Sequence, residues 1–481
     1  MDSEKFRRQL RQEAEQWWHD GWIDNALYEK LAQRYQFPSL ESDAKSRFVV
    51  ILMGLGGILL GLGLITYVAA NWQGWPREFR TLLLFTLFVA VNAAGFYLWR
   101  RSPSRGGQRL GHGLLLLGAL TLGANLGLTS QMFHQSGNLY ELYLVWSLGV
   151  LVMAYGLKLA SLGILSLILM VIGYFLGVGD WFSGSALSWR VLIEHMPLVI
   201  AGLFLPLAYR CQSRALFGLA AIGVVISLQG NLGLLLSADS PGWLLAIAIA
   251  LPPALLWSFT DRFWQWRPSP AAVANKPNQL FPRPAKSPLP FEAISRVLAV
   301  TLLTLVLYVL SFHWFWQDRW FNFSSSPMSS TTPLFLSVGV LGLIALWGWA
   351  RLSHQGWSSG FRLPENAINS GAIAACILLQ TGIVVWHEQV TLPILGPLIV
   401  NGLLFVLSLA LVRDGLALSQ RGMFWGGMLT LVLSIMSRTL EYNTDLLIKA
   451  LAFALCGAGI IIAGLWFERH VKPNHPLPEK S

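Results

Sequence analysis

Residues 48–70 read FVVILMGLGGILLGLGLITYVAA, which is 23 consecutive residues without a charged side chain. A helix of this length crosses a hydrocarbon core about 30 Å thick. The chain contains fourteen such apolar runs in its 481 residues, separated mostly by short loops. Because helices satisfy their own backbone polar groups in lipid, the pattern predicts an all-α polytopic membrane protein. About fourteen transmembrane helices are expected, and twelve to fourteen fit the sequence.

The composition supports this class over a soluble one. Hydrophobic residues make up 54% of the chain and charged residues only 12%, whereas soluble domains carry about 25% charged residues. The net charge of +10 raises the alternative of nucleic-acid binding. The basic residues, however, flank the apolar runs, as the orientation of membrane helices requires. The sequence therefore predicts the lipid bilayer, and not a nucleic acid, as the partner.

The expected spans end within a few residues of the charged loops. They lie at about 48–70, 79–99, 110–130, 139–157, 159–178, 192–209, 215–237, 242–260, 293–312, 333–350, 367–386, 391–412, 422–437 and 446–467. With a cytoplasmic amino terminus, 28 of the Lys and Arg residues fall in inner segments and 6 in outer ones. This asymmetry predicts that both termini are cytoplasmic. The expected location is a bacterial cytoplasmic (inner) membrane.

The chain organisation follows from these spans. Residues 1–47 form a cytoplasmic helical hairpin and linker, 48–157 a four-helix membrane region, and 158–260 further membrane helices. Residues 261–292 hold seven prolines and form a cytoplasmic linker, followed by membrane helices at 293–467 and a cytoplasmic tail at 468–481. The linker should be extended and unpacked.

The amino-terminal hairpin is predicted from two apolar stripes. Leu10, Ala14 and Trp17 share one face of a first helix, and Asp24 is placed to cap a second. Two short helices bury little surface by themselves. The hairpin therefore serves either as a docking module for a protein partner or only as a tether.

Polar residues gather at the outer ends of the first four spans. The first span ends in Ala-Ala-Asn-Trp, and residues 130–141 are rich in polar groups. Polar side chains near hydrocarbon are costly and often functional. The candidate cluster is Asn71, Trp72, Asn125, Gln131, His134, Asn138, Glu141 and Trp146. We expect Asn71 to approach the 131–141 segment; the alternative is that these residues only tie the span ends together.

The same segments carry a resemblance to a known family. Gly21-Trp22-Ile23, the Asn71-Trp72 end of the first span and the stretch from Gln131 to Trp146 together resemble bacterial polytopic membrane proteins. That family is defined by an amino-terminal domain of unknown function, and the resemblance covers roughly residues 1–157. It implies the architecture and brings no substrate, reaction or cofactor.

Other polar positions suggest structural roles. Glu194-His195 and His387-Glu388 lack the HExxH spacing of a zinc site, and the histidines are interpreted as solvated interface residues, with no metal or cofactor expected. Gln229 and Asn231 either line a cavity or form interhelical hydrogen bonds, of which the second is the commoner use.

Three functions remain open from the sequence. The leading hypothesis is a non-enzymatic role as a transport-type pathway or membrane scaffold. The second is a transporter of a small solute or lipid, and the third is an intramembrane enzyme with an outward-facing site around His134. Few ionisable residues lie within the spans, which disfavours ion-coupled transport.

Overall fold

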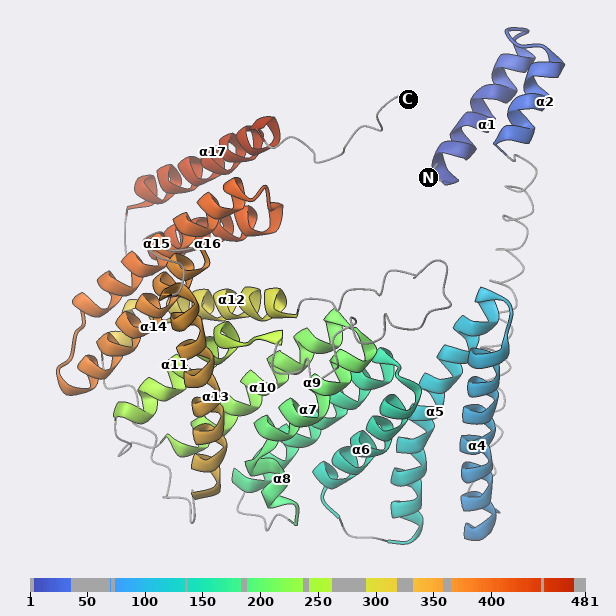
Figure 1. Ribbon diagram of the computed structural model, residues 1–481, viewed down its shortest axis with the longest axis horizontal. Coiled ribbons are helices and arrows are strands. Elements are labelled where there is room, and N and C mark those ends of the chain that lie inside the picture. Colours follow the sequence, from blue (N-terminus) through green and yellow to red (C-terminus); the bar gives the residue numbers. More distant parts are fainter. Residues whose placement is uncertain are drawn as a thin grey trace, which may run out of the picture. The chain divides into compact units, whose positions relative to one another are not determined.

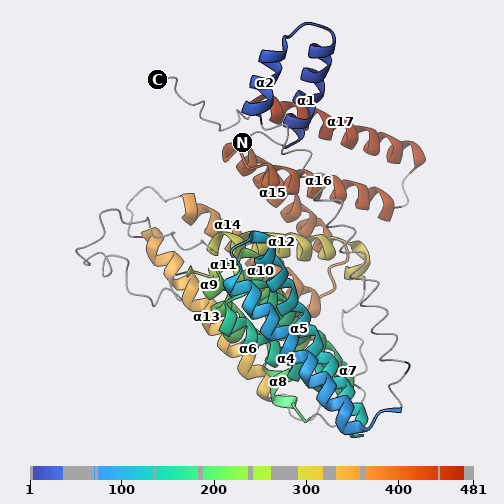
Figure 2. The ribbon, with the colours of Figure 1, turned by 90° about the vertical axis from the view of Figure 1, so that its right-hand side faces the viewer.

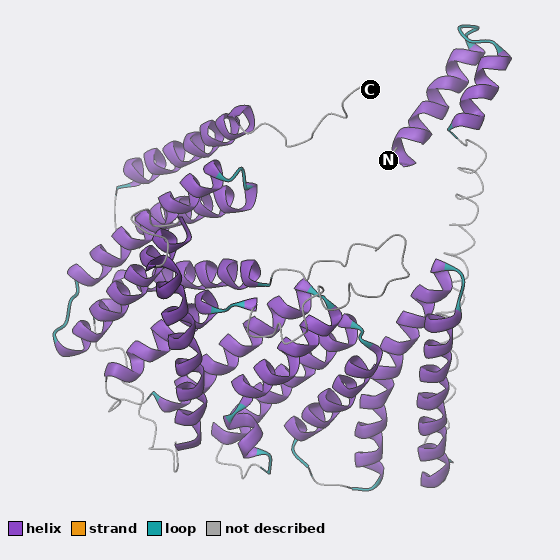
Figure 3. Ribbon diagram, in the orientation of Figure 1, coloured by secondary structure: helices purple, strands orange, loops and turns teal. Residues whose placement is uncertain are grey.

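The computed structural model describes residues 4–35, 70, 74–134, 137–182, 188–236, 242–261, 291–317, 332–357, 365–442 and 445–470. Within these ranges the chain forms sixteen α-helices and one short 3-10 helix, without a strand (Figure 3). The all-α class predicted from the sequence is confirmed. The chain divides into two compact units, residues 1–87 and 88–481.

The first unit contains the helical hairpin. Its helices are α1 (Glu4–His19) and α2 (Asn25–Arg34). Gly21 takes a φ of +73° in the turn between them, a conformation that glycine adopts without strain. Asp24 caps α2, because its side chain accepts a hydrogen bond from the Leu27 N–H, 2.9 Å away. Ala14 is fully buried between the helices, against Leu10 and other apolar side chains. The predicted stripe at Leu10, Ala14 and Trp17 and the cap at Asp24 are therefore present.

The helix α4 (Arg77–Arg101) runs across the boundary between the units. The second unit continues with α5 (Arg105–Met132), α6 (Leu139–Leu157), α7 (Ala160–Phe182), α8 (Arg190–Glu194), α9 (Met196–Cys211), α10 (Arg214–Leu235) and α11 (Gly242–Ser258). After residues 262–290 come α12 (Glu292–Leu310), the 3-10 helix η4 (His313–Trp316), α13 (Thr332–Trp357), α14 (Glu365–Gln389), α15 (Leu395–Ala417), α16 (Arg421–Glu441) and α17 (Leu446–His470).

The second unit has two apolar cores. In the first core, α6 packs along α7 and α9 along α10, as the turquoise and green helices in Figure 1 show. In the second core, α11 packs against α12 and α14, while α15 lies beside α16 in both Figure 1 and Figure 2. Trp257 Nε1 donates to Ser370 Oγ at 3.1 Å and thereby joins the end of α11 to the start of α14. These two helices are antiparallel.

Eleven of the described helices are long and apolar enough to cross a membrane, and α9 and α11 are shorter apolar helices. They coincide in position with the second to fourteenth predicted spans, whereas residues 48–69 of the first predicted span lie outside the described residues. Many apolar side chains on these helices face outward; Leu446 and Leu447 of α17 are 81% and 75% exposed. So much exposed apolar surface implies that the helices are embedded in a lipid bilayer.

The sixth predicted span, about 192–209, contains a helix break near its start. The structure places a break at His195 between α8 and α9 and begins the membrane helix at Met196. Pro197 lies in the first turn of α9, where its missing N–H costs no intrahelical hydrogen bond. The proline therefore starts a new helix instead of continuing the preceding one.

Candidate functional site

The eight residues of the predicted polar cluster do not share one environment. Asn71 and Trp72 lie outside the described residues. Asn125 lies within α5 and Trp146 within α6. The remaining four, Gln131, His134, Asn138 and Glu141, lie where α5 ends and α6 begins.

Asn125 and Trp146 form packing contacts. Asn125 Nδ2 donates to the Thr121 carbonyl on its own helix, at 2.8 Å. Trp146 Nε1 donates to the Ala119 carbonyl of α5, also at 2.8 Å. A Cβ added at Gly123 would lie 2.3 Å from Trp146 Cε2, so the indole fits only because that position is glycine. Trp146 therefore fastens α6 to α5.

Two described polar side chains at the end of α5 face the surface. Gln131 and His134 are both exposed, and His134 adopts a φ of +51°, a conformation uncommon outside glycine. Asn138 is the residue before α6 but makes no capping hydrogen bond with its side chain. Glu141 lies in the first turn of α6, where the helix dipole favours a negative charge.

Glu141 is linked to the interior through its neighbour. The hydroxyl of Tyr140, a fully buried residue, donates to Glu141 Oε1 at 3.2 Å and accepts from the Trp189 N–H at 3.4 Å. Trp189 directly precedes α8. Of the sequence-predicted residues, Glu141 is thus the one that the structure connects to the following helices.

A larger polar network lies at these helix ends. Asn231 of α10 is its centre: the amide Nδ2 donates to the Glu194 carbonyl at 2.7 Å, and Oδ1 accepts from the Tyr174 hydroxyl at 2.9 Å. The Glu194 carboxylate, 2% exposed as a residue, pairs with Arg190 Nε at 2.7 Å. Arg190 also lies over the Trp181 ring, 4.9 Å from its centroid.

Helix α13 joins the same network. Ser337 Oγ donates to the Glu194 carbonyl at 3.3 Å and lies 2.7 Å from His195 Nδ1. We call Tyr174, Arg190, Glu194, His195, Asn231 and Ser337 the Glu194 network. Beside it, an open depression of about 420 Å³ is lined by Ser188, Trp189, Val191, Leu192, His195 and Val199. His195 is the ionisable side chain of that lining.

An apolar cavity of about 280 Å³ lies farther along α10 and α13, away from the ends that carry Asn231 and Ser337. It is lined by residues of α9, α10, α11, α12 and α13, among them Leu205, Phe217 and Trp347. Two hydroxyls of the lining already donate to backbone: Ser258 Oγ to the Leu255 carbonyl at 3.1 Å and Ser295 Oγ to the Leu256 carbonyl at 2.6 Å. The surface offered by the cavity is therefore almost wholly apolar.

A cation lies close to this cavity. The exposed guanidinium of Arg351, one turn beyond Trp347 on α13, lies over the Trp347 ring, 3.8 Å from its centroid. This distance is typical of a cation–π contact. Gly348 permits the close approach of α13 to α11, because a Cβ there would lie 2.6 Å from the Ser258 carbonyl oxygen.

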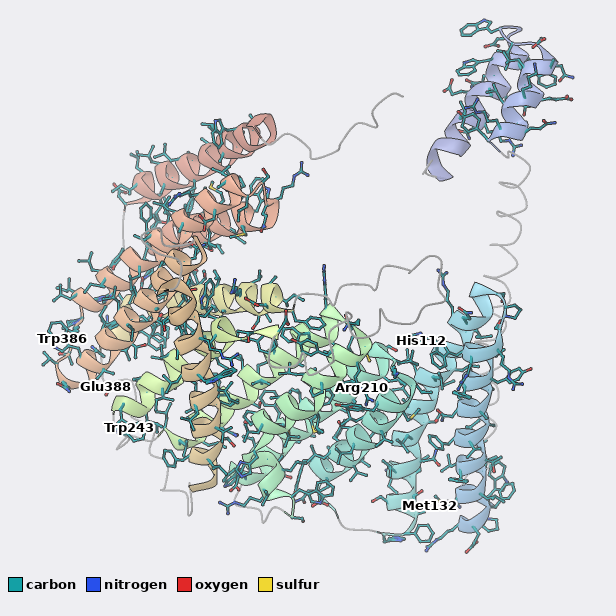
Figure 4. The ribbon with its side chains drawn as sticks, viewed as in Figure 1. His112, Met132, Arg210, Trp243, Trp386 and Glu388 are labelled. Carbon is teal, nitrogen blue, oxygen red and sulfur yellow. The ribbon has the colours of Figure 1, made fainter. Side chains whose placement is uncertain are left out.

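The structure corrects the interpretation of His387 as a solvated interface residue. His387 is fully buried. Its Nδ1 accepts a hydrogen bond from the Leu392 N–H at 3.0 Å, and its ring packs against Trp316. Figure 4 labels its neighbours Trp386 and Glu388 near the end of α14, and Trp243 at the start of the antiparallel α11. Among the described residues, no three His, Cys, Asp or Glu side chains gather as metal ligands.

Sequence reasoning found part of the Glu194 network and missed the rest. It named Asn231 and favoured interhelical hydrogen bonding for it, which the bond to Glu194 confirms. It gave no signal for Tyr174 or Ser337, because a single tyrosine or serine within a span is common and carries no pattern. The apolar cavity also has no sequence signature, since its lining residues resemble any other part of a membrane helix.

Comparison with known proteins agrees with this picture. Residues 15–163 match the model of a family described as predicted membrane protein (DUF2157). The matched segment begins within the hairpin and ends in the first turn of α7. No curated protein matches the chain, and no solved structure does. The resemblance inferred from the sequence is confirmed: residues 15–163 match the model of DUF2157, a family of predicted membrane proteins of unknown function.

Proposed function

We propose that this protein is a non-enzymatic, lipid-binding protein of a bacterial cytoplasmic membrane, with fourteen spans and both termini in the cytoplasm. The 28-to-6 distribution of basic residues supports the orientation. Eleven long and two shorter apolar helices support the span count, together with the apolar run at 48–70. In this orientation the apolar cavity lies in the cytoplasmic half of the membrane and the Glu194 network at the outer face.

The apolar cavity carries the functional proposal. The cavity has a volume of about 280 Å³ and lies among five helices. Its lining residues include no acid, base or histidine. Such a lining suits an acyl chain and offers no group for proton transfer. Arg351, exposed beside Trp347, adds a cation where an anionic headgroup would lie. We therefore assign the occupant as an anionic phospholipid whose acyl chain enters the cavity.

The occupant must be selected by shape and charge together. Lipid tails surround the helices everywhere, so burial of apolar surface alone gives a bound chain little advantage over bulk lipid. A fixed cavity next to a guanidinium favours a lipid with a negative headgroup over a zwitterionic one. This argument favours a lipid scaffold or a lipid-transport pathway over transport of a small polar solute.

The test places a larger side chain in the cavity, at a position where the added atoms meet no neighbour. Gly202 lines the cavity, and a Cβ there would meet no atom within 4 Å, so Gly202→Phe should occupy the volume without a backbone clash. Gly233 of α10 is likewise exposed and unobstructed but does not line the cavity, so Gly233→Phe is the matched control. The measurement is retention of phosphatidylglycerol by the purified full-length protein, followed by native mass spectrometry.

We expect wild type and Gly233→Phe to retain phosphatidylglycerol over phosphatidylcholine, and Gly202→Phe to lose that retention. Equal retention by all three proteins would contradict the proposal. Reconstitution with a fluorescent phospholipid then separates the two forms of the function: movement of lipid between leaflets that Gly202→Phe abolishes indicates transport, and its absence in wild type indicates a scaffold.

A further inference from the structure

Arg438 is held at a junction of helix ends in the carboxyl-terminal part of the second unit. It lies in the last turn of α16, and its Nη1 donates to the carbonyl of Ser311, the residue that follows α12, at 2.6 Å. Asn401 Nδ2 donates to the same carbonyl at 2.9 Å. A cation suits this place because carbonyl groups at a helix carboxyl end carry partial negative charge.

Both carboxylate oxygens of Glu441, the ion-pair partner of Arg438, already accept hydrogen bonds. Glu441 Oε2 accepts from Arg438 Nη1, and Glu441 Oε1 accepts from the His313 N–H at 2.6 Å. The plane of the guanidinium is fixed as well, since its central carbon lies 4.1 Å from the centroid of the Phe312 ring. One nitrogen of the guanidinium thus makes both of the hydrogen bonds to Ser311 and Glu441.

The other two nitrogens, Nε and Nη2, are buried and have no hydrogen-bond partner among the residues that the structure describes. In a guanidinium their N–H bonds point the same way along one edge, which forms the fork that binds carboxylate or phosphate with two parallel hydrogen bonds. Buried charged donors without a partner are strongly unfavourable. Two such donors left unpaired on one edge therefore destabilise the folded protein. An oxyanion that accepts a hydrogen bond from each of them would remove this free-energy cost.

From this geometry we propose that Arg438 is an anion-binding residue and that its Nε/Nη2 edge takes a phosphate oxyanion. In the proposed topology Arg438 lies at an outer span end, the depth at which phospholipid phosphates occur. The phosphate is either that of a lipid headgroup or a free phosphate. The site is separate from the apolar cavity, which lies among α9 to α13.

Arg296 provides a matched control within the chain. It also pairs with a glutamate on its own helix, Glu292, and lies over an aromatic ring, with its central carbon 5.8 Å from the Trp257 centroid. Within the described part of the chain, Nε of Arg296 is buried without a partner while Nη2 is bonded to Glu292, so Arg296 offers no free fork. Arg→Lys at either position keeps the charge and removes the planar fork.

The test measures apparent Kd values of the full-length protein by native mass spectrometry. The probes are inorganic phosphate, phosphatidylglycerol, and diacylglycerol as the phosphate-free lipid. The lipid arms use the Gly202→Phe background, so that a lipid in the apolar cavity does not contribute. Binding of inorganic phosphate identifies a free anion as the ligand, whereas binding of phosphatidylglycerol alone identifies a lipid headgroup.

We expect Arg438→Lys to raise the apparent Kd of the phosphate-bearing ligand by about tenfold or more, since the substitution removes a bidentate contact. Arg296→Lys should leave the Kd unchanged. Glu441→Gln should tighten binding, because it removes the nearest negative charge while leaving Arg438 in place, and it remains informative if Arg438→Lys does not fold. Equal Kd values for wild type, Arg438→Lys and Glu441→Gln would overturn the proposal, as would wild-type binding of neither phosphate-bearing probe.

Discussion

Gln229 of α10 donates its Nε2 hydrogen to the carbonyl oxygen of Ala248 in α11, 3.1 Å away. In a regular helix that carbonyl would accept from the N–H four residues later, but position 252 is proline and has none. The glutamine of one helix therefore replaces the hydrogen bond that the proline removes from the other. This explains how α11 remains helical through Pro252 and Pro253.

Gln229→Leu should lower the free energy of unfolding by about 1–3 kcal/mol, because it leaves a buried carbonyl without a partner. Pro252→Ala restores a backbone donor, so adding it to Gln229→Leu should recover most of the loss. Thermal unfolding of the purified wild type, the two single variants and the double variant gives the coupling free energy between Gln229 and Pro252. Additive effects of the two substitutions would show that Gln229 does not compensate for the proline.

The topology prediction rests on the distribution of basic residues. Reporter fusions after residues 105 and 275 should report the cytoplasm, and fusions after 136 and 325 the opposite side. If 105 and 136 report the same side, the assignment of the second to fourth spans is wrong. If 275 and 325 agree with each other, the error lies in the ninth span.

The sequence-predicted cluster stays a prediction that function can test. His134 and Gln131 are exposed at the end of α5, where substitution removes no buried contact. His134→Ala or Gln131→Ala should therefore impair complementation of a deletion strain while membrane abundance stays the same. Complementation and abundance are measured on the same membranes. A loss of function that scales with a loss of protein would instead favour the alternative that the cluster only ties the span ends together.

The hairpin prediction follows from its exposed aromatic side chains. Trp18 and Trp22 are 49% and 76% exposed, although Ala14 and its neighbours already form the contact between the two helices. We propose that this surface binds a protein partner. Deleting residues 2–37 should leave an inserted membrane protein, since the spans carry their own insertion signal, but abolish complementation. Full complementation by the deleted chain would leave only the role of a tether.

The sequence by itself determined the helices. Apolar runs of membrane length, the proline and charge positions between them, and the cap at Asp24 act locally, so α6 occupies the same residues, 139–157, that the pattern predicts. Periodicity and length are properties of a single segment, and lipid requires each segment to satisfy its own backbone. Where local rules compete, as at His195 and Pro197, the helix boundary moved by a few residues.

Tertiary structure alone decided which polar groups meet. Asn231, Glu194 and Ser337 are far apart in the chain, yet the packing of α8, α10 and α13 brings them into one network. The same is true of Ser311 and Arg438, which are 127 residues apart, and of the five helices around the apolar cavity. Helix packing within lipid depends on shape and on a few hydrogen bonds, which leave no periodic trace in the sequence. The free edge of Arg438 is visible only after its other partners are in place.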